Sequence, residues 1–322
     1  MNGAPGTRRV AFVFPGQGSQ KVGMGRAWAA ASEAARRTFE EADEALGEPL
    51  SRLCWEGPEE ELGMTVNTQP ALLAASTAVH RALAGTPLAA VVPVALAGHS
   101  LGEYSALVAA GALPFAAALR LVRRRGELMQ AAVPVGEGAM AAVLGLDAAV
   151  VAEVARQASA DQEGELCAVA NLNAPSQTVI AGHRAAVDRA VALARERGAR
   201  KATLLPVSAP FHSPLMRPAR LGMIEPLREA PFADPRVPVV ANVDAAPVTT
   251  AEAARDALAR QIDGPVRWVE SVQWMEREAG VELFLELGPG NVLAGLIRRI
   301  AEQATVASLG EPEQIDKFLA AG

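Results

Sequence analysis

The chain has 322 residues, of which 50% are hydrophobic and 4% aromatic, and its formal net charge is −6 at pH 7. This length suits one large domain with a smaller one, and the negative charge argues against a general nucleic-acid binder. Two cysteines, Cys54 and Cys167, are too few for a disulfide framework, and the four histidines lack zinc-binding spacing, so we expect no metal. The N-terminal apolar run at 10–14 is too short for a signal peptide, and no segment approaches the length of a membrane span, so we expect no membrane association and a cytoplasmic protein.

The N-terminal third begins with a short tail, residues 1–8, which we expect to be flexible. A buried strand is predicted at residues 10–14, because this run is wholly apolar. Helices are predicted at residues 25–46 and 67–86, and Pro70 fits the first turn of the second helix.

A glycine-rich loop at residues 15–20 follows the first strand. A glycine on each side of Gln17 lets the backbone bend sharply and bring an amide or the Gln17 side chain near a ligand. An ordinary turn is the alternative interpretation. In enzymes with a nucleophile elbow, such a loop often supplies one of the donors that bind an oxyanion.

The central motif of the chain is Gly98-x-Ser100-x-Gly102. An apolar run at 91–97 predicts a buried strand before it, and a helix-forming segment begins at Leu101. A serine between two glycines in this strand–turn–helix context is typical of a nucleophile elbow, which exposes the hydroxyl. The elbow also directs the Leu101 amide toward charge that develops beside the serine. The alternative is a glycine-rich turn with an incidental serine.

An arginine-rich helix is predicted at residues 114–131. Its four arginines cannot share one face, because the last of them turns about 100° beyond its neighbour. These arginines are Arg120, Arg123, Arg124 and Arg125. Arg125 could therefore point inward while the others face water, and an inward arginine needs an anionic partner.

The pattern changes in residues 136–206, which read as a separate unit inserted in the larger domain. Strands are predicted at 139–146, 166–172, 177–181 and 202–205, and helices at 147–158 and 183–197. This β-α-β-β-α-β order predicts a ferredoxin-like subdomain.

A proline-rich loop at 206–216 then leads back into the larger domain and holds His212 between two prolines. A serine nucleophile needs a base, and the other histidines are less well placed for that role. His80 lies within a predicted helix, His99 adjoins the serine on the elbow, and His183 lies in the insert. His212 is therefore the best candidate for the base, and a simple loop histidine is the alternative.

The remaining chain alternates helices and strands. Helices are predicted at 213–230, 250–262, 266–278 and 291–303, and strands at 237–240 and 281–287. This alternation implies a parallel sheet with helices on both faces, whose active residues gather at the carboxyl ends of the strands.

Six motifs in chain order carry a resemblance to a known family. They are Phe12-Val-Phe-Pro-Gly-Gln-Gly-Ser-Gln20, Gly98-His-Ser-Leu-Gly-Glu-Tyr-Ser-Ala106, Arg125-Gly126, Asn171-Leu-Asn-Ala-Pro-Ser176, Val207-Ser-Ala-Pro-Phe-His-Ser213 and Glu286-Leu-Gly-Pro-Gly290. Together they closely resemble the malonyl-CoA:acyl carrier protein transacylases, from about residue 9 to residue 310. The resemblance implies an α/β-hydrolase-like catalytic domain at 9–135 and 207–322, with a ferredoxin-like subdomain at 136–206.

The resemblance also implies a role for each matching position. Ser100 would be the nucleophile and His212 the base, and Arg125 would bind the malonyl carboxylate. The Leu101 amide and Gln17 would form the oxyanion hole.

Further positions complete the expected site. In the family a carbonyl rather than an acid orients the histidine, and Gln261 matches that position. A search from the residues alone would have tried Asp244 as a third member of the triad, and the sequence leaves that alternative open. We also place His99, Phe211 and Met129 in the substrate pocket; the bulk of Phe211 would crowd a branched acyl group.

The expected activity is transfer of malonyl from malonyl-CoA to the phosphopantetheine thiol of acyl carrier protein, for fatty-acid synthesis. The expected kinetics are ping-pong through a malonyl-serine, with no permanently bound cofactor and a monomeric enzyme. Alternatives are a free-standing acyltransferase of a polyketide pathway, with malonyl or a larger extender unit, an acyl-thioester hydrolase, and a non-catalytic carrier-protein-binding relative. Because carrier proteins are generally acidic, docking requires a local basic patch. Its candidates are Arg120, Arg123, Arg124, Lys201, Arg217, Arg220, Arg298 and Arg299.

Overall fold

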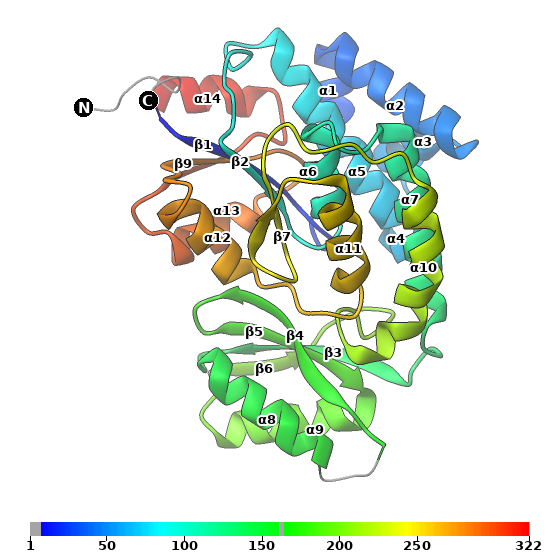
Figure 1. The fold of residues 1–322 in the computed structure, drawn as a ribbon, viewed down its shortest axis with the longest axis vertical. Coiled ribbons are helices and arrows are strands. Elements are labelled where there is room, and N and C mark those ends of the chain that lie inside the picture. The colour runs from blue at the N-terminus through cyan, green and yellow to red at the C-terminus, as the bar shows by residue number, and fades with distance from the viewer. Residues whose placement is uncertain (1–7, 161–163, 322) are drawn as a thin grey trace.

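Two β-sheets organise the structure, a computed structural model that describes residues 8–160 and 164–321 (Figure 1). The larger sheet contains β1 (Val10–Phe14), β2 (Ala95–Gly98), β7 (Val239–Ala241), β8 (Ala246–Val248), β9 (Leu283–Glu286) and β10 (Thr305–Ser308). Its strand order is β10-β9-β1-β2-β7-β8, and every neighbouring pair is parallel except β7 and β8. The prediction of a parallel sheet is confirmed for every pair except the last, because β8 turns back antiparallel to β7.

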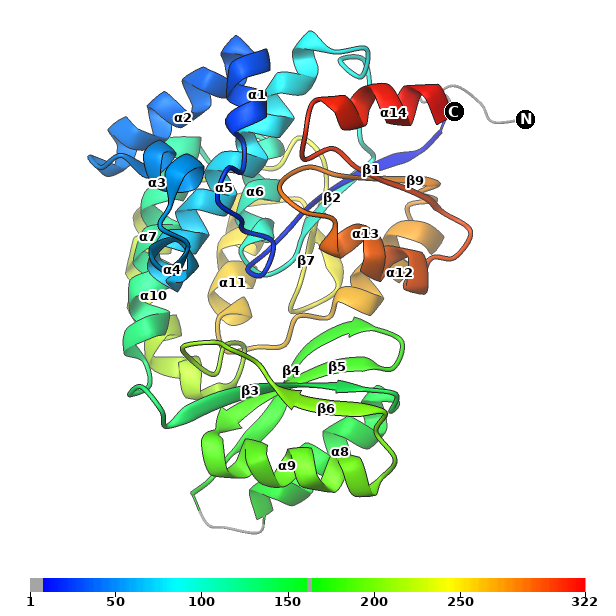
Figure 2. The same ribbon diagram turned by 180° about the vertical axis from the view of Figure 1, so that it is seen from behind.

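Helices cover both faces of the larger sheet, as Figure 2 shows from behind. Alternate residues of β1 enter different hydrophobic clusters: Phe12 and Phe14 join one, and Ala11 and Val13 the other. The first cluster packs against α1 (Arg26–Ala31), α2 (Glu33–Leu46), α3 (Leu50–Glu56), α4 (Glu59–Gly63), α5 (Thr65–Ala82), α6 (Gly102–Ala109), α7 (Phe115–Ala131), α10 (Arg217–Glu229), α11 (Ala251–Gln261) and α14 (Glu313–Ala321). The second packs against α12 (Trp268–Arg277) and α13 (Val292–Ile300).

The smaller sheet is antiparallel and lies in the lower part of Figure 1. Its unit runs β3 (Gly138–Leu144), α8 (Ala148–Ala160), β4 (Cys167–Ala174), β5 (Gln177–His183), α9 (Arg184–Glu196) and β6 (Lys201–Leu204). The strand order is β4-β5-β3-β6, so the first and third strands of the unit are adjacent at the centre. The predicted β-α-β-β-α-β order of a ferredoxin-like subdomain is confirmed. We keep 136–206 as the proposed boundaries of this subdomain.

Backbone hydrogen bonds that the sequence did not predict join the smaller sheet to the segment between α11 and α12. The Val266 amide donates to the Ala170 carbonyl at 2.8 Å, and the Leu172 amide donates to the Val266 carbonyl at 2.9 Å. Strand β4 thereby pairs with the segment that leads into α12. The next residue, Arg267, donates its amide to the Asn242 carbonyl at 3.0 Å, so this segment links the smaller sheet to the carboxyl end of β7.

Two helix predictions were wrong in position. The predicted helix at 25–46 is two helices, because Ser32 leaves the helical conformation and caps α2. The second helix, α5, begins at Thr65, so Pro70 lies inside it rather than in its first turn. Proline has no amide hydrogen, which frees the Val66 carbonyl four residues earlier, and the Arg123 guanidinium donates to that carbonyl at 3.0 Å.

Most other elements lie within a few residues of their predicted ranges. Strand β2 is shorter than the predicted run at 91–97, and the helix predicted at 213–230 begins as a 3₁₀ turn, Pro214–Met216. A second 3₁₀ turn, Leu83–Gly85, follows α5. Within the described part of the chain, no helix combines the length and apolar character needed to cross a bilayer.

Candidate active site

The elbow between β2 and α6 holds Ser100 in a left-handed backbone conformation, with φ 52°. Its flanking glycines are required by close backbone contacts. A Cβ on Gly98 would lie 1.9 Å from Gly102, and one on Gly102 would lie 2.1 Å from the Phe14 carbonyl oxygen. Only residues without side chains fit here, because strand, turn and helix pass so close to one another.

His212 faces this serine from the loop after β6. Its Nε2 lies 2.7 Å from Ser100 Oγ, and its Nδ1 lies 2.9 Å from the backbone carbonyl oxygen of Gln261. A carbonyl only accepts hydrogen bonds, so Nδ1 must carry the proton. Nε2 is then left with a free electron pair that accepts the Ser100 hydroxyl proton. Like Ser100, His212 has a positive φ, 58°.

Asp244 is not the third member of this pair. Its two carboxylate oxygens bind the Arg260 guanidinium, at 2.7 Å and 2.6 Å. The His212 ring bonds the Gln261 carbonyl instead. The alternative that an acid orients the histidine through Asp244 is therefore wrong, because a surface arginine holds that carboxylate.

Arg125 points inward from α7 and is only 2% exposed. Its Nη1 donates to Gln69 Oε1 at 2.8 Å, and its Nη2 donates to Gln261 Oε1 at 2.8 Å and to Ser100 Oγ at 3.2 Å. Across residues 8–160 and 164–321, no carboxylate forms an ion pair with it. Its buried Nε has no hydrogen-bond partner among the same residues. A buried guanidinium with only neutral partners is suited to receive an anionic ligand.

The two predicted oxyanion donors lie beside the elbow. Leu101 is the N-cap of α6, and amides at a helix N-terminus have no partner within the helix. The Gln17 loop packs on the elbow, since a Cβ on Gly16 would lie 2.3 Å from the His99 carbonyl oxygen. The Gln17 side-chain oxygen accepts a hydrogen bond from Thr65 Oγ1 at 3.0 Å, which leaves the side-chain NH₂ group and the backbone amide of Gln17 as its donors.

The three residues predicted to line the pocket have different surroundings. His99 Nε2 lies 2.8 Å from Asn173 Oδ1 of β4, and the His99 ring packs edge-on against Trp268. Phe211, directly before His212, is buried in the large hydrophobic cluster. Met129 is buried one turn beyond Arg125, with its sulfur 3.9 Å from Gln69 Nε2.

Three residues of the site were not given a role by sequence reasoning. Gln69 binds Arg125, Asn242 Oδ1 accepts the Ser100 amide hydrogen at 2.6 Å, and Glu103 binds Gln261. Glu103 directly follows the central motif, one turn after the serine, and Asn242 directly follows a strand of the larger sheet. The position of Glu103, an acidic residue in the first turn of an otherwise mainly apolar helix, was the one signal in the sequence that could have indicated its role.

The electrostatics of the site favour a neutral histidine and a partly protonated glutamate. Burial, and then the positive charge of Arg125, lower the pKa of His212 to about 3. Burial raises the pKa of Glu103 to about 7, against the hydrogen bonds it accepts from Asn242 and Gln261. Burial also lowers the pKa of Arg125. His212 is thus available as a base at neutral pH.

The raised pKa of Glu103 predicts a pH-dependent stability difference. The pKa is about 7 in the folded protein and 4.5 in the unfolded chain, so between these values the folded state binds more protons at this group. The contribution of Glu103 to the free energy of unfolding therefore falls as pH rises through this window. Glu103→Gln cannot ionise, so its Tm relative to the native protein should increase from pH 5 to pH 8, measured by calorimetry. A constant or decreasing Tm difference would contradict the assignment.

A strand–helix elbow whose serine bonds a histidine, in a mainly parallel α/β sheet, is typical of enzymes that form acyl-serine esters. A family model described as an acyl transferase domain matches residues 11–319. The chain therefore belongs to the acyl transferase family, and this sequence-based prediction is confirmed.

Individual relatives within the family are similar over nearly the whole chain. The malonyl CoA-acyl carrier protein transacylase of Escherichia coli K12 is 50% identical over 304 residues, 94% of this chain and 96% of that protein. The protein of the same name from Bacillus subtilis is 47% identical over 308 residues, 96% of this chain and 95% of the relative.

Solved structures agree with these relatives. The malonyl CoA-acyl carrier protein transacylase of Coxiella burnetii has a TM-score of 0.93 and 44% identity, covering 97% of each chain. A malonyl-transacylase in complex with a type II PKS acyl-carrier protein also has a TM-score of 0.93 and 44% identity, covering 98% of this chain and 100% of that one.

Proposed function

We propose that the protein transfers the malonyl group of malonyl-CoA to the phosphopantetheine thiol of an acyl carrier protein, in fatty-acid synthesis. The observation that carries this proposal is Arg125, a buried guanidinium without a carboxylate partner in the described residues, 3.2 Å from Ser100 Oγ. Relatives about half identical in sequence are named for this activity.

In the first half-reaction, His212 Nε2 removes the proton of Ser100 as Oγ attacks the thioester carbonyl. The Leu101 amide and an amide of Gln17 bind the oxyanion of the tetrahedral intermediate. When the intermediate collapses, the C–S bond breaks, and His212 gives its proton to the leaving CoA thiolate. A malonyl ester remains on Ser100, and free CoA departs.

In the second half-reaction, His212 removes the proton of the carrier-protein thiol, and the sulfur attacks the ester carbonyl. The same donors bind the oxyanion. Collapse breaks the bond to Ser100 Oγ, which regains a proton from His212. Water in place of the thiol would make the enzyme a hydrolase, so the fate of the ester distinguishes the two activities.

Arg125 couples binding of the acyl group to the strength of the base. Its planar guanidinium can bind a carboxylate through two parallel hydrogen bonds, and an acetyl group would leave its charge unpaired. Arg125 is also one cause of the lowered pKa of His212. A malonyl carboxylate that neutralises Arg125 raises the pKa of His212, so the correct substrate makes the imidazole a stronger base.

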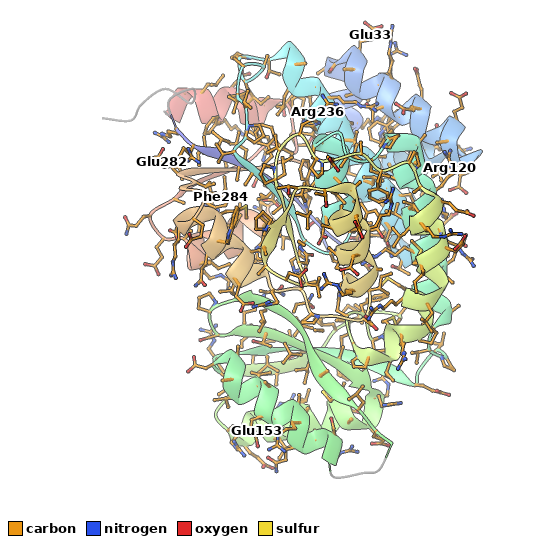
Figure 3. The ribbon with its side chains drawn as sticks, in the orientation of Figure 1. Glu33, Arg120, Glu153, Arg236, Glu282 and Phe284 are labelled. Carbon is orange, nitrogen blue, oxygen red and sulfur yellow. The ribbon has the colours of Figure 1, made fainter. Side chains whose placement is uncertain are left out.

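The carrier protein is proposed to dock on a basic part of the surface. Five of the eight predicted docking residues form no ion pair within residues 8–160 and 164–321: Arg120, Lys201, Arg217, Arg298 and Arg299. Figure 3 shows Arg120 at the outer surface. Arg123, Arg124 and Arg220 are paired with Glu48, Glu127 and Asp263, so they are weaker candidates. We further propose a cytoplasmic monomer without a permanently bound cofactor.

Intact-protein mass spectrometry tests the proposed function. The protein is mixed with malonyl-CoA, methylmalonyl-CoA or acetyl-CoA, and then with phosphopantetheine-bearing carrier protein. We expect a malonyl adduct that is absent in Ser100→Ala and that passes to the carrier protein. An adduct that decays equally fast in water without carrier protein would show a hydrolase, and a methylmalonyl adduct formed as readily as malonyl would favour a polyketide pathway. No adduct with any of the three would overturn the proposal.

A further inference from the structure

Glu103 is a buried carboxylate that the proposed reaction does not use directly. It lies in α6, one turn after Ser100, and is 1% exposed. One of its oxygens, Oε2, accepts two hydrogen bonds: from the backbone amide of Asn242 at 2.8 Å and from Gln261 Nε2 at 2.9 Å. In the described part of the chain, no lysine or arginine forms an ion pair with it. A buried charge held only by neutral donors is costly, which points to a use in the site.

Both partners of Glu103 also hold the backbone of Ser100. Asn242 Oδ1 accepts the Ser100 amide hydrogen at 2.6 Å, and Gln261 Nε2 donates to the Ser100 carbonyl at 3.0 Å. A left-handed conformation is unfavourable for serine and persists only where its surroundings fix it. The Glu103 carboxylate thus ties the backbone of Asn242 to the side chain of Gln261, the two residues whose side chains fix the nucleophile.

Gln261 also binds the two other functional side chains of the site, His212 and Arg125. Its backbone carbonyl accepts from His212 Nδ1, and its side-chain oxygen accepts from Arg125 Nη2 at 2.8 Å. An ionised carboxylate and a backbone carbonyl can only accept hydrogen bonds, so the NH₂ group of Gln261 must face Glu103 and the Ser100 carbonyl. The amide oxygen is then left facing Arg125, which can only donate.

We propose that Glu103 is a positioning residue: the charge of its carboxylate, together with the Ser100 carbonyl, holds the orientation of the Gln261 amide, and that orientation presents the Arg125 guanidinium to the carboxylate of the acyl group. This inference rests on the proposed function. The proposal gives Glu103 a role in substrate selection. Glu103 forms no hydrogen bond with Arg125 and acts on it through Gln261.

The test is Glu103→Gln, which keeps the shape of the side chain and removes its charge. The new amide can donate to Gln261 Oε1, which favours a Gln261 amide turned with its NH₂ group against Arg125. Only the Ser100 carbonyl and Arg125 then oppose that turn. The readout is the ratio of kcat/KM for malonyl-CoA to that for acetyl-CoA at pH 8. We expect this ratio to fall about tenfold, the effect of one lost hydrogen bond to a charged group. A purely structural role would lower both values in proportion and leave the ratio unchanged.

A double-mutant cycle tests whether the effect passes through Gln261. Gln261→Met keeps the backbone carbonyl that binds His212 and removes the side-chain amide. Alone, it should lower the ratio by a similar factor, and Glu103→Gln added to it should change the ratio by less than about twofold. The matched control is Glu286→Gln, because Glu286 is also a fully buried carboxylate but binds the Leu293 and Ala294 amides at the start of α13. It should leave the ratio unchanged.

The outcomes separate this inference from the proposed function. If the native protein forms no malonyl ester, the proposed function is overturned, whatever the results for the variants. If the native protein forms the ester, an unchanged ratio in Glu103→Gln overturns the inference. An equal fall of the ratio with and without the Gln261 side chain overturns it as well. If Glu103→Gln does not fold, Gln261→Met decides alone, and an unchanged ratio in that variant overturns the inference.

Discussion

Replacing His212 with alanine is expected to slow formation of the malonyl ester on Ser100 by about 10³-fold, the usual contribution of a positioned general base. His212 Nε2 lies 2.7 Å from Ser100 Oγ and accepts its proton, since the Gln261 carbonyl holds the proton of the ring on Nδ1. Without the imidazole, the Ser100 hydroxyl must attack with its proton in place or lose it to water.

The rate is measured by quenching single turnovers and weighing the intact protein. His183→Ala is the matched control, because His183 is a loop-facing histidine at the end of β5 that binds the Leu166 amide. This control should acylate within about twofold of the native protein. Normal acylation in His212→Ala would show that another group accepts the proton and would remove His212 from the mechanism.

Replacing Arg125 with alanine is expected to lower the preference for malonyl-CoA over acetyl-CoA by about 100-fold. The variant leaves the malonyl carboxylate without a cation in a buried site, whereas an acetyl group loses no partner. The loss of the positive charge also removes one cause of the lowered pKa of His212, so acetyl transfer should not fall in parallel. The side-chain oxygens of Gln69 and Gln261 lose their donor as well.

The measurement is kcat/KM for each acyl-CoA, with carrier protein saturating. Arg124→Ala is the matched control on the same helix, since Arg124 is exposed and paired with Glu127 at 2.9 Å. It should leave the preference unchanged. Arg125→Lys should recover only part of it, because an ammonium group lacks the planar pair of donors. A preference that survives Arg125→Ala would show that another group binds the carboxylate.

The sequence predicted the elements of the fold well where the signal is local. The elbow could be located because Gly98, Ser100 and Gly102 are neighbours in the chain, and the β-α-β-β-α-β insert followed from its order of strands and helices. Helix geometry indicated that Arg125 could point inward, because the four arginines cannot share one face.

Other features depend on contacts between distant residues, which spacing does not encode. Glu103 binds Asn242 and Gln261, which lie 139 and 158 positions further along the chain, so the sequence alone did not indicate its role. The same holds for Asp244, whose carboxylate suited a triad by type but is bound by Arg260. Pro70 read as a helix start because its missing amide fits a first turn, yet Arg123 satisfies the carbonyl that it frees inside α5.

The backbone conformations of Ser100 and His212 lower the stability of the folded protein at the positions that activity requires. Ser100 and His212 have φ values of 52° and 58°, a region that glycine enters freely and other residues enter at a cost of about 1 kcal/mol each. Substituting glycine at position 100 would relieve that strain and remove the nucleophile in one step. Laboratory evolution that selects only for heat resistance would therefore favour glycine at positions 100 and 212, and the resulting proteins would be inactive. Selection for a more heat-stable enzyme must therefore include an activity screen in every round, and the stabilising substitutions must lie elsewhere in the chain.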